Sequence, residues 1–140
     1  MPKIMVFGLM DIDRYAGEPD KSTTLFSRHN LEFFELSLNN DILYGYPLEM
    51  KGTDSINFYH RFLENTFRLD NSLCSTVITQ KSFEQSNFLI VHNFGDLENE
   101  QGHLNLKIKF KNALTQKLML LYMPVCNKTL HFDNNYNIKK

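Results

Sequence analysis

Residues 104–110 alternate strictly between apolar and polar side chains, and no other segment restricts the fold as much. The apolar positions are Leu104, Leu106, Ile108 and Phe110, and the positions between them are polar. Side chains of a β-strand point alternately to opposite faces of its sheet, so a period of two places one row in a core and the other in solvent. We therefore predict an antiparallel sheet with one buried face.

Several other short segments have strand-like composition and are separated by turn residues. We predict strands at residues 3–9, 31–38, 41–46, 74–79, 88–91, 117–123 and 129–132. Asn39-Asn40 lies between two of these segments, and asparagine tolerates the positive φ angles of a tight hairpin turn. Residues 56–67 follow Ser55, a residue type that caps helices, and repeat phenylalanine near helical spacing, which predicts one helix.

The predicted fold class is therefore all-β, an antiparallel jelly-roll or β-sandwich of about eight strands with one short helix. A length of 140 residues is typical of one domain, so we expect residues 1–140 to form a single jelly-roll-like domain. The side chains expected in its core are Phe7, Leu36, Phe62, Ile90, Leu106, Ile108, Phe110 and Leu120.

The charge balance narrows the choice of partners. The chain has 15 Lys and Arg against 16 Asp and Glu, a formal net charge of -1. A nucleic-acid binder needs a basic surface that displaces counterions from phosphates, so we expect no direct readout of nucleic acid. Lys107, Lys109 and Lys111 alternate along one predicted strand and mark a solvated face. A net charge near zero provides little self-repulsion and so tolerates association.

Segments for membrane insertion, secretion or disulfide formation are not expected either. No apolar run approaches the roughly 20 residues of a membrane span, so we expect no membrane partner. The N-terminal residues lack the apolar stretch and cleavage site of a signal peptide, which predicts an intracellular protein. Cys74 and Cys126 lie far apart without a CxxC motif, so reduced thiols are expected.

Two acidic segments suggest metal binding, and each has a simpler interpretation. Asp11-Ile12-Asp13 resembles the Asp-x-Asp of metal-dependent glycosyl transfer. That enzyme class needs a nucleotide-binding α/β domain, and the chain has no strand–helix alternation, so a turn that ends a strand is favoured. The acidic loop at 95–102 departs from the EF-hand pattern, which leaves a generic oxygen-ligand site or a solvated loop.

No catalytic constellation emerges from the remaining reactive residues. The histidines show neither HxH nor HxxxH spacing; they are His29, His60, His92, His103 and His131. Nothing in the sequence places Cys74 beside His92, and neither a P-loop nor a GxGxxG motif is present. We therefore predict a protein that is not an enzyme, with no catalytic residue, no cofactor and no bound metal.

Two predicted strands are apolar at consecutive positions and so need cover on both faces. These are residues 88–91 and 118–123, and a lone two-sheet sandwich covers only inner faces. The predicted helix and the loops are one source of cover, and a second domain or subunit is the other. If a partner supplies the cover, the residues on the faces turned from the core form the interface; these interface candidates are Leu89, Val91, Met119 and Leu121.

Ordered blocks along the chain resemble a known family. The blocks are 6–11, 25–26, 30–36, 40–41, 46–48, 58–62, 102–110, 113–115, 118–122 and 130–133. Together they resemble the C-terminal region of the virus-like proteins encoded by Polinton (Maverick) elements and adintovirus-like relatives. The resemblance covers nearly the whole chain, and it implies a capsid-type protein with jelly-roll architecture from a lineage whose capsid proteins carry two jelly rolls and form trimers.

Two departures from that family bear on the interpretation. Its proteins are several hundred residues long, so we expect this chain to be a fragment, a domesticated remnant or a single-domain derivative. Residues 92–96 read His-Asn-Phe-Gly-Asp where an Asp-Leu-Ser/Thr-Pro pattern is expected, so that loop's contacts do not carry over.

Three classes of function follow. The first is a structural protein that self-associates as a trimer or higher oligomer, or binds a second jelly-roll domain or capsid subunit, inside a cell or in a virion. The second is a ligand-binding β-sandwich that holds a carbohydrate or metal on its loops, with Tyr15, Tyr44 and Tyr46 as aromatic contacts. The third, an enzyme built from scattered residues, is disfavoured because no acid–base pair is apparent.

Overall fold

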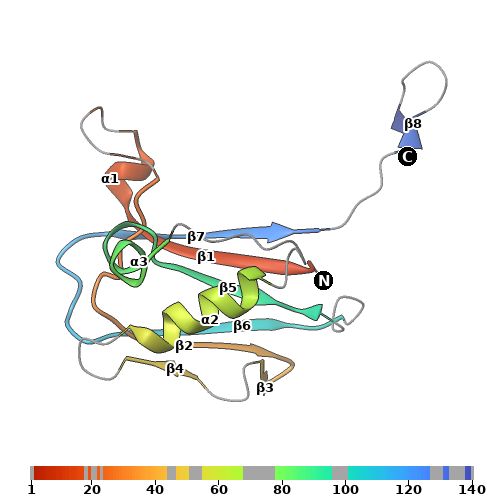
Figure 1. The fold of residues 1–140 in the computed structure, drawn as a ribbon, viewed down its shortest axis with the longest axis horizontal. Helices are drawn as coiled ribbons and strands as arrows, with labels where there is room; N and C mark the ends of the chain where they lie inside the picture. Colours follow the sequence, from red (N-terminus) through yellow and green to blue (C-terminus); the bar gives the residue numbers. More distant parts are fainter. Residues whose placement is uncertain are drawn as a thin grey trace.

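The computed structural model of the chain is mostly β-structure, with antiparallel sheets and few helices. It describes residues 2–17, 19, 22, 24–43, 47–50, 55–67, 78–95, 101–126, 131–132 and 138–139. One sheet, called here the β1 sheet, has β1 (Ile4–Asp11) in its centre, with β5 (Leu89–Asn93) on one edge and β7 (Leu118–Val125) on the other (Figure 1).

The second sheet, called here the β2 sheet, is centred on β2 (Leu31–Leu38). Strand β6 (Leu104–Phe110) pairs along one edge of β2, and two short strands, β3 (Asp41–Ile42) and β4 (Leu48–Glu49), pair along the other. A separate hairpin of β8 (His131–Phe132) and β9 (Ile138–Lys139) stands away from both sheets (Figure 1).

The two best local signals of the sequence are confirmed. Asn39 and Asn40 have φ angles of 52° and 77° and connect β2 to β3, so the predicted hairpin turn is present. The alternating segment 104–110 is strand β6 with the bounds expected. Its apolar residues are partly buried and its polar residues are exposed, as a strand with one buried face requires.

A phenylalanine pair joins the two sheets. The rings of Phe7 on β1 and Phe34 on β2 meet edge to face, with centroids 5.5 Å apart. Of the expected core residues, four are buried and four are partly buried against the core. The first group is Phe7, Leu36, Phe62 and Ile90, and the second is Leu106, Ile108, Phe110 and Leu120.

The predicted helix is confirmed as α2 (Ile56–Phe67), but the expectation of a single helix is wrong. The structure adds α1 (Ile12–Tyr15), one turn long, and α3 (Gln80–Ser86). Helix α3 is capped by Thr79, whose hydroxyl accepts a hydrogen bond from the Ser82 backbone N–H at 3.2 Å. A seven-residue helix with one buried apolar residue, Phe83, shows no periodicity that a sequence reading could detect.

Several predicted strands differ from the observed ones. Of the strand expected at 74–79, residues 74–77 lie outside the described residues, and Ile78 and Thr79 lead into α3 instead. The strand expected at 41–46 is shorter, ending at Ile42, and the acidic residues of loop 95–102 are not described. Nine strands occur within the described residues, four of them only two residues long.

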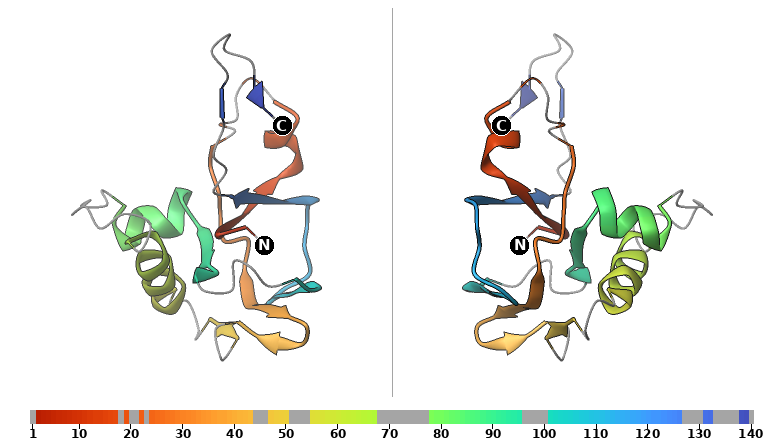
Figure 2. Two further views of the ribbon diagram at one scale, coloured as in Figure 1. Left: turned by 90° about the vertical axis from the view of Figure 1, so that its right-hand side faces the viewer. Right: turned by 90° about the vertical axis from the view of Figure 1, so that its left-hand side faces the viewer.

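An aromatic cluster closes one side of the two sheets. Phe83 of α3 lies between Phe62 of α2 and Phe88 beside β5, with ring centroids 5.2 Å and 5.0 Å apart. Phe58 of α2 also contacts Phe88, at 5.4 Å. Figure 2 shows α2 beside the sheets, between β5 and β4. The helix therefore seals the side of the core, and it does not lie flat on an outer sheet face.

One histidine is enclosed in this core. His92 on β5 is 5% exposed, and its ring lies edge-on to that of Phe94 with centroids 4.6 Å apart. Burial disfavours the charged imidazolium, and the positive charge of Arg61 adds to this, so the pKa of His92 falls from 6.5 to about 4. The folded protein therefore holds this ring neutral at physiological pH.

We expect the free energy of unfolding to decline as pH falls from 6.5 towards 4. In that pH range His92 is protonated in the unfolded chain but stays neutral in the folded chain. This difference lowers the free energy of unfolding by up to about 3 kcal/mol. Urea denaturation at several pH values checks this. His92→Phe should flatten that part of the profile, whereas replacement of the exposed His103 by Asn should leave it unchanged. Parallel profiles for wild type and His92→Phe would contradict the assignment.

Candidate protein interface

The outer face of the β1 sheet, turned away from the core, gathers the four interface candidates. Residues paired directly across antiparallel strands point to the same face. Gly8 pairs with Leu89 on one side and with Leu121 on the other. In the same way Val6 pairs with Val91, and Met10 with Met119. Because Gly8, Val6 and Met10 alternate with the core residues Phe7 and Leu9, all four candidates share this outer face.

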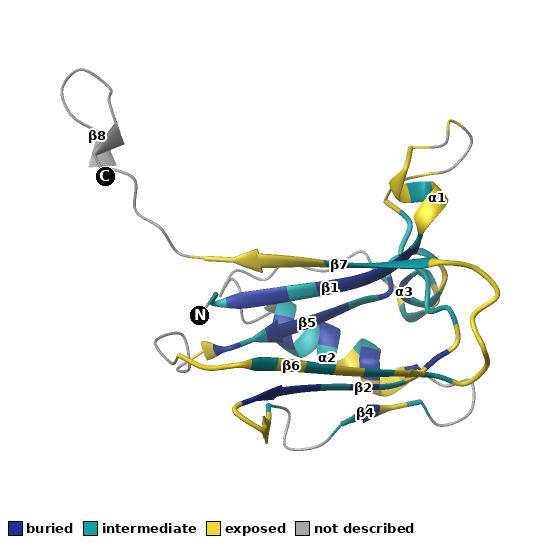
Figure 3. Ribbon diagram, turned by 180° about the vertical axis from the view of Figure 1, so that it is seen from behind, coloured by how far each residue is buried: buried dark blue, intermediate teal, exposed yellow. Residues whose placement is uncertain are grey.

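Cover on this face is incomplete. Val91 is buried at 3% exposed, whereas Leu89, Met119 and Leu121 are only partly buried. Exposure increases along β7, and Figure 3 shows the strand passing from partly buried to exposed towards its C-terminal end. There Met123, on the outer face, is 59% exposed, and Tyr122, which pairs with Phe7 and so points to the other face, is 66% exposed. Large apolar side chains of the chain thus stay in contact with solvent along one strand.

A groove runs across the same face, and Phe26 forms one of its walls. Segment 25–27 lies beside the end of β1 and the start of β5, because the Ser27 N–H donates to the Leu9 carbonyl and the Phe88 N–H to the Phe26 carbonyl. The Phe26 ring lies directly over Gly8, where a Cβ atom would stand 2.5 Å from the ring. The groove has a volume of about 330 Å³ and an almost entirely apolar lining; it is lined by Val6, Gly8, Phe26, Leu89, Leu121, Tyr122 and Met123.

The outer face of the β2 sheet has the opposite character. Lys107 and Lys109 on β6 are exposed there, as the alternation of lysines predicted. The Lys107 ammonium lies 3.4 Å from a Glu35 carboxylate oxygen, and the Lys109 ammonium lies 5.0 Å from the centroid of the Phe33 ring. A charged face of this kind is stable in water. The outer face of the β2 sheet therefore suits contact with water, whereas the outer face of the β1 sheet is apolar.

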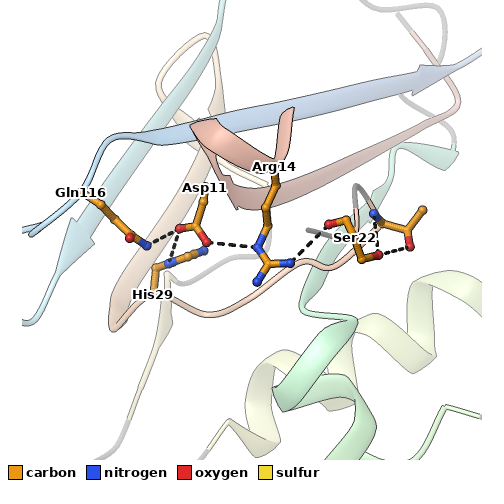
Figure 4. Close-up of polar contacts among 6 residues, drawn as sticks. Asp11, Arg14, Ser22, His29 and Gln116 are labelled. Atoms are coloured by element: carbon orange, nitrogen blue, oxygen red, sulfur yellow. Dashed lines mark hydrogen bonds and ion pairs between the residues drawn. The ribbon is translucent and has the colours of Figure 1, made fainter. Parts of the chain in front are cut away.

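The Asp-x-Asp segment is a structural junction. Asp11 ends β1 and accepts a hydrogen bond at 3.1 Å from the Arg14 side chain, which also bonds the Ser22 carbonyl. The Gln116 side chain donates to the other carboxylate oxygen, and the His29 ring lies 3.7 Å from it (Figure 4). Asp11 thus ties α1, the segment before β2 and the β6–β7 connection to one point.

The histidines are dispersed. His29 lies beside Asp11, where burial lowers its pKa. His60 lies 3.5 Å from Glu64 on α2, His92 is in the core, and His103 is exposed beside Asn39. Among the described residues no group of three or more His, Cys, Asp or Glu side chains is placed to hold a metal ion. His131 and Cys74 have no described side chain, and Cys126 is exposed as a free thiol.

Three residues that line the groove have no distinct signal in the sequence. Phe26 lies outside every predicted strand and helix, and an isolated aromatic residue there gives no pattern. Tyr122 and Met123 lie in a run of apolar residues, which predicts cover on both faces. Pro124 was the available signal, since proline within a strand indicates an edge strand, whose outward groups face solvent.

Comparisons of the chain with protein-family models, curated proteins and solved structures find no match. Within the described residues, the helices are all too short and too polar to span a bilayer. The feature of this chain that indicates a function is its surface, an apolar groove beside an exposed strand.

Replacing Gly8 with Ala should destabilise the protein, although alanine normally favours a strand over glycine. The new methyl group would stand 2.5 Å from the Phe26 ring and would displace it from the groove wall, at a cost of about 1–3 kcal/mol. Chemical denaturation measures the effect. In a Phe26→Ala background the same substitution should cost much less, and an equal cost in both backgrounds would show that the ring does not lie on Gly8.

Proposed function

We propose that the chain is a structural assembly protein, a capsid-type β-sandwich domain that acts by packing the outer face of its β1 sheet against another protein surface. The apolar groove on that face carries the proposal. Exposed apolar surface of this kind costs free energy in water, and proteins that keep it generally use it as an interface. A partner that covers the groove removes Leu89, Leu121 and Met123 from solvent.

The contrast between the two outer faces supports the proposal. Folding alone permits charged residues on both outer faces of a two-sheet protein. This chain has them on the outer face of its β2 sheet, where Lys107, Lys109 and Glu35 lie. On the β1 sheet the corresponding positions are aliphatic or sulphur-containing instead. Interface cores are typically depleted in charged residues and enriched in aromatic residues and methionine, which matches Phe26 and Met123 on this face.

The jelly-roll architecture and the resemblance to Polinton and adintovirus-like capsid proteins belong to this proposal. Their support is the chain path, which passes from β5 in one sheet to β6 in the other and back to β7. Repeated crossing between two antiparallel sheets is characteristic of Greek-key and jelly-roll folds. The partner is then another capsid-type subunit or jelly-roll domain, within a cell or a virion.

Replacing Leu121 with Lys should weaken assembly more than folding. The residue is partly buried on the outer face, so a lysine there can reach solvent in the free subunit but would be desolvated under a partner. Size-exclusion chromatography with light scattering gives the oligomer mass, and a thermal melt gives stability. Leu114→Lys is the matched control, because Leu114 is 46% exposed on the β6–β7 connection. An unchanged oligomer with a lower melting temperature for Leu121→Lys would contradict the proposal.

A second candidate function is ligand binding, and one observation favours it. A pocket of about 180 Å³ lies where β2 begins and β6 ends; Arg28, Asn30, Glu32, Lys111 and Asn112 supply its polar lining. Polar groups converging on a concavity suit a carbohydrate or another small polar ligand. A glycan array together with metal analysis tests it: the ligand-binding function predicts a signal that Asn112→Ala reduces, and an array and a metal assay without signal would contradict it.

A further inference from the structure

We propose that the occupant of this surface is a second copy of the same chain, which adds its own β7 antiparallel to β7 and joins two β1 sheets into one six-stranded sheet. This inference rests on the proposed assembly function and names its partner and its mode of contact. The two copies are related by a two-fold axis through Leu120.

The outer edge of β7 is unpaired among the described residues, where β7 pairs only with β1. The Ile12 N–H donates to the Lys117 carbonyl, in continuation of the β1–β7 register. Along an antiparallel strand the backbone groups of successive residues point alternately to one neighbour and to the other. The N–H and C=O groups of Met119, Leu121 and Met123 therefore form hydrogen bonds with β1. The backbone groups of Leu118, Leu120 and Tyr122 therefore point outwards from the free edge. Pro124 also belongs to the residues whose backbone groups point away from β1. Only at such a position does a residue without an N–H lose no hydrogen bond to β1.

Charge indicates what can lie beside this edge. From Leu118 to Val125, β7 carries no charged residue. A lysine or glutamate set opposite Leu121 would be desolvated against apolar side chains, so a neighbouring strand must itself be uncharged. The β7 strand of a second copy meets this condition. Figure 2 shows β6 and β7 on the side away from α2 and α3, and β6 carries Lys107 and Lys109 where β7 has only apolar residues. Lysines on edge strands discourage pairing, and β7 lacks them.

The missing N–H of Pro124 limits the possible registers. When Leu120 pairs with Leu120 of the other copy, Leu118 pairs with Tyr122, and every outward N–H of this stretch meets an outward carbonyl. Pro124 then falls opposite Gln116, outside the strand. Moving the two-fold axis from Leu120 to Leu121, which slides the strands by two residues, places Pro124 opposite Leu118 and leaves the Leu118 carbonyl without a donor. The favoured register also sets Met119 directly opposite Leu121 of the other copy, on the outer face beside the groove.

The mass and dissociation constant of the full chain test the pairing. Wild type should form an even-numbered oligomer by light scattering and sedimentation. Tyr122→Pro removes an outward N–H without removing a bond to β1, and should raise the dissociation constant by tenfold or more. Tyr122→Thr removes the same ring but keeps the N–H, and should stay associated. Equal dissociation constants for wild type and Tyr122→Pro, or an odd-numbered oligomer, would overturn the pairing.

Disulfide cross-linking tests the register and does not require the proline variant to fold. In a background with both native cysteines replaced by serine, Met119→Cys and Leu121→Cys proteins should cross-link when mixed, because residues at non-hydrogen-bonded positions lie about 4.5 Å apart. Neither protein alone should do so. Cross-linking of Leu121→Cys with itself would overturn the register.

The pattern of failure separates the two proposals. An oligomer that Leu89→Lys or Leu121→Lys dissociates, but that Tyr122→Pro leaves intact, overturns the edge pairing and supports assembly through the face. A wild type that stays monomeric at every concentration overturns the pairing and counts equally against self-assembly.

Discussion

The packing of β1 on β2 is the constraint on which the rest of the structure depends. Phe7 and Phe34 meet across the two sheets, and the buried side chains around them form one continuous core. Because β1 points Phe7 and Leu9 inwards, its alternate residues Val6, Gly8 and Met10 must point outwards. The outer face is therefore formed by the alternate residues of β1, β5 and β7, and of the four interface candidates there only Val91 is buried.

This division explains how a small chain places an interface next to its own core. Helices α2 and α3 use their aromatic residues to close the β5 side, and β6 and β7 lie on the opposite side (Figure 2). Phe26 covers part of the outer face, and only because Gly8 has no side chain below it. The uncovered part of the face is a groove that borders the edge of β7. A partner bound there can bury apolar side chains and pair with the backbone of a strand at the same site.

Local sequence patterns predicted those elements whose formation depends on local chemistry. The Asn39-Asn40 turn, the alternating strand β6 and helix α2 each have a sequence cause within their own residues, and each is confirmed. Helix α3 was missed because its stability comes from one capping threonine and one phenylalanine inserted into a distant cluster. Phe26 was missed for the same reason, since its position depends on backbone hydrogen bonds from its segment to Leu9 of β1, to Ser86 of α3 and to Phe88.

For the interface, the sequence by itself determined which strands have too many apolar residues for one core: 88–91 and 118–123. It did not determine where their second faces would lie. Only the tertiary structure placed Leu89, Met119 and Leu121 on one surface, buried Val91, and left Tyr122 and Met123 exposed. The physical reason is that hydrophobicity is a property of a residue, whereas exposure depends on which strands become neighbours and which strand is left at the edge of its sheet.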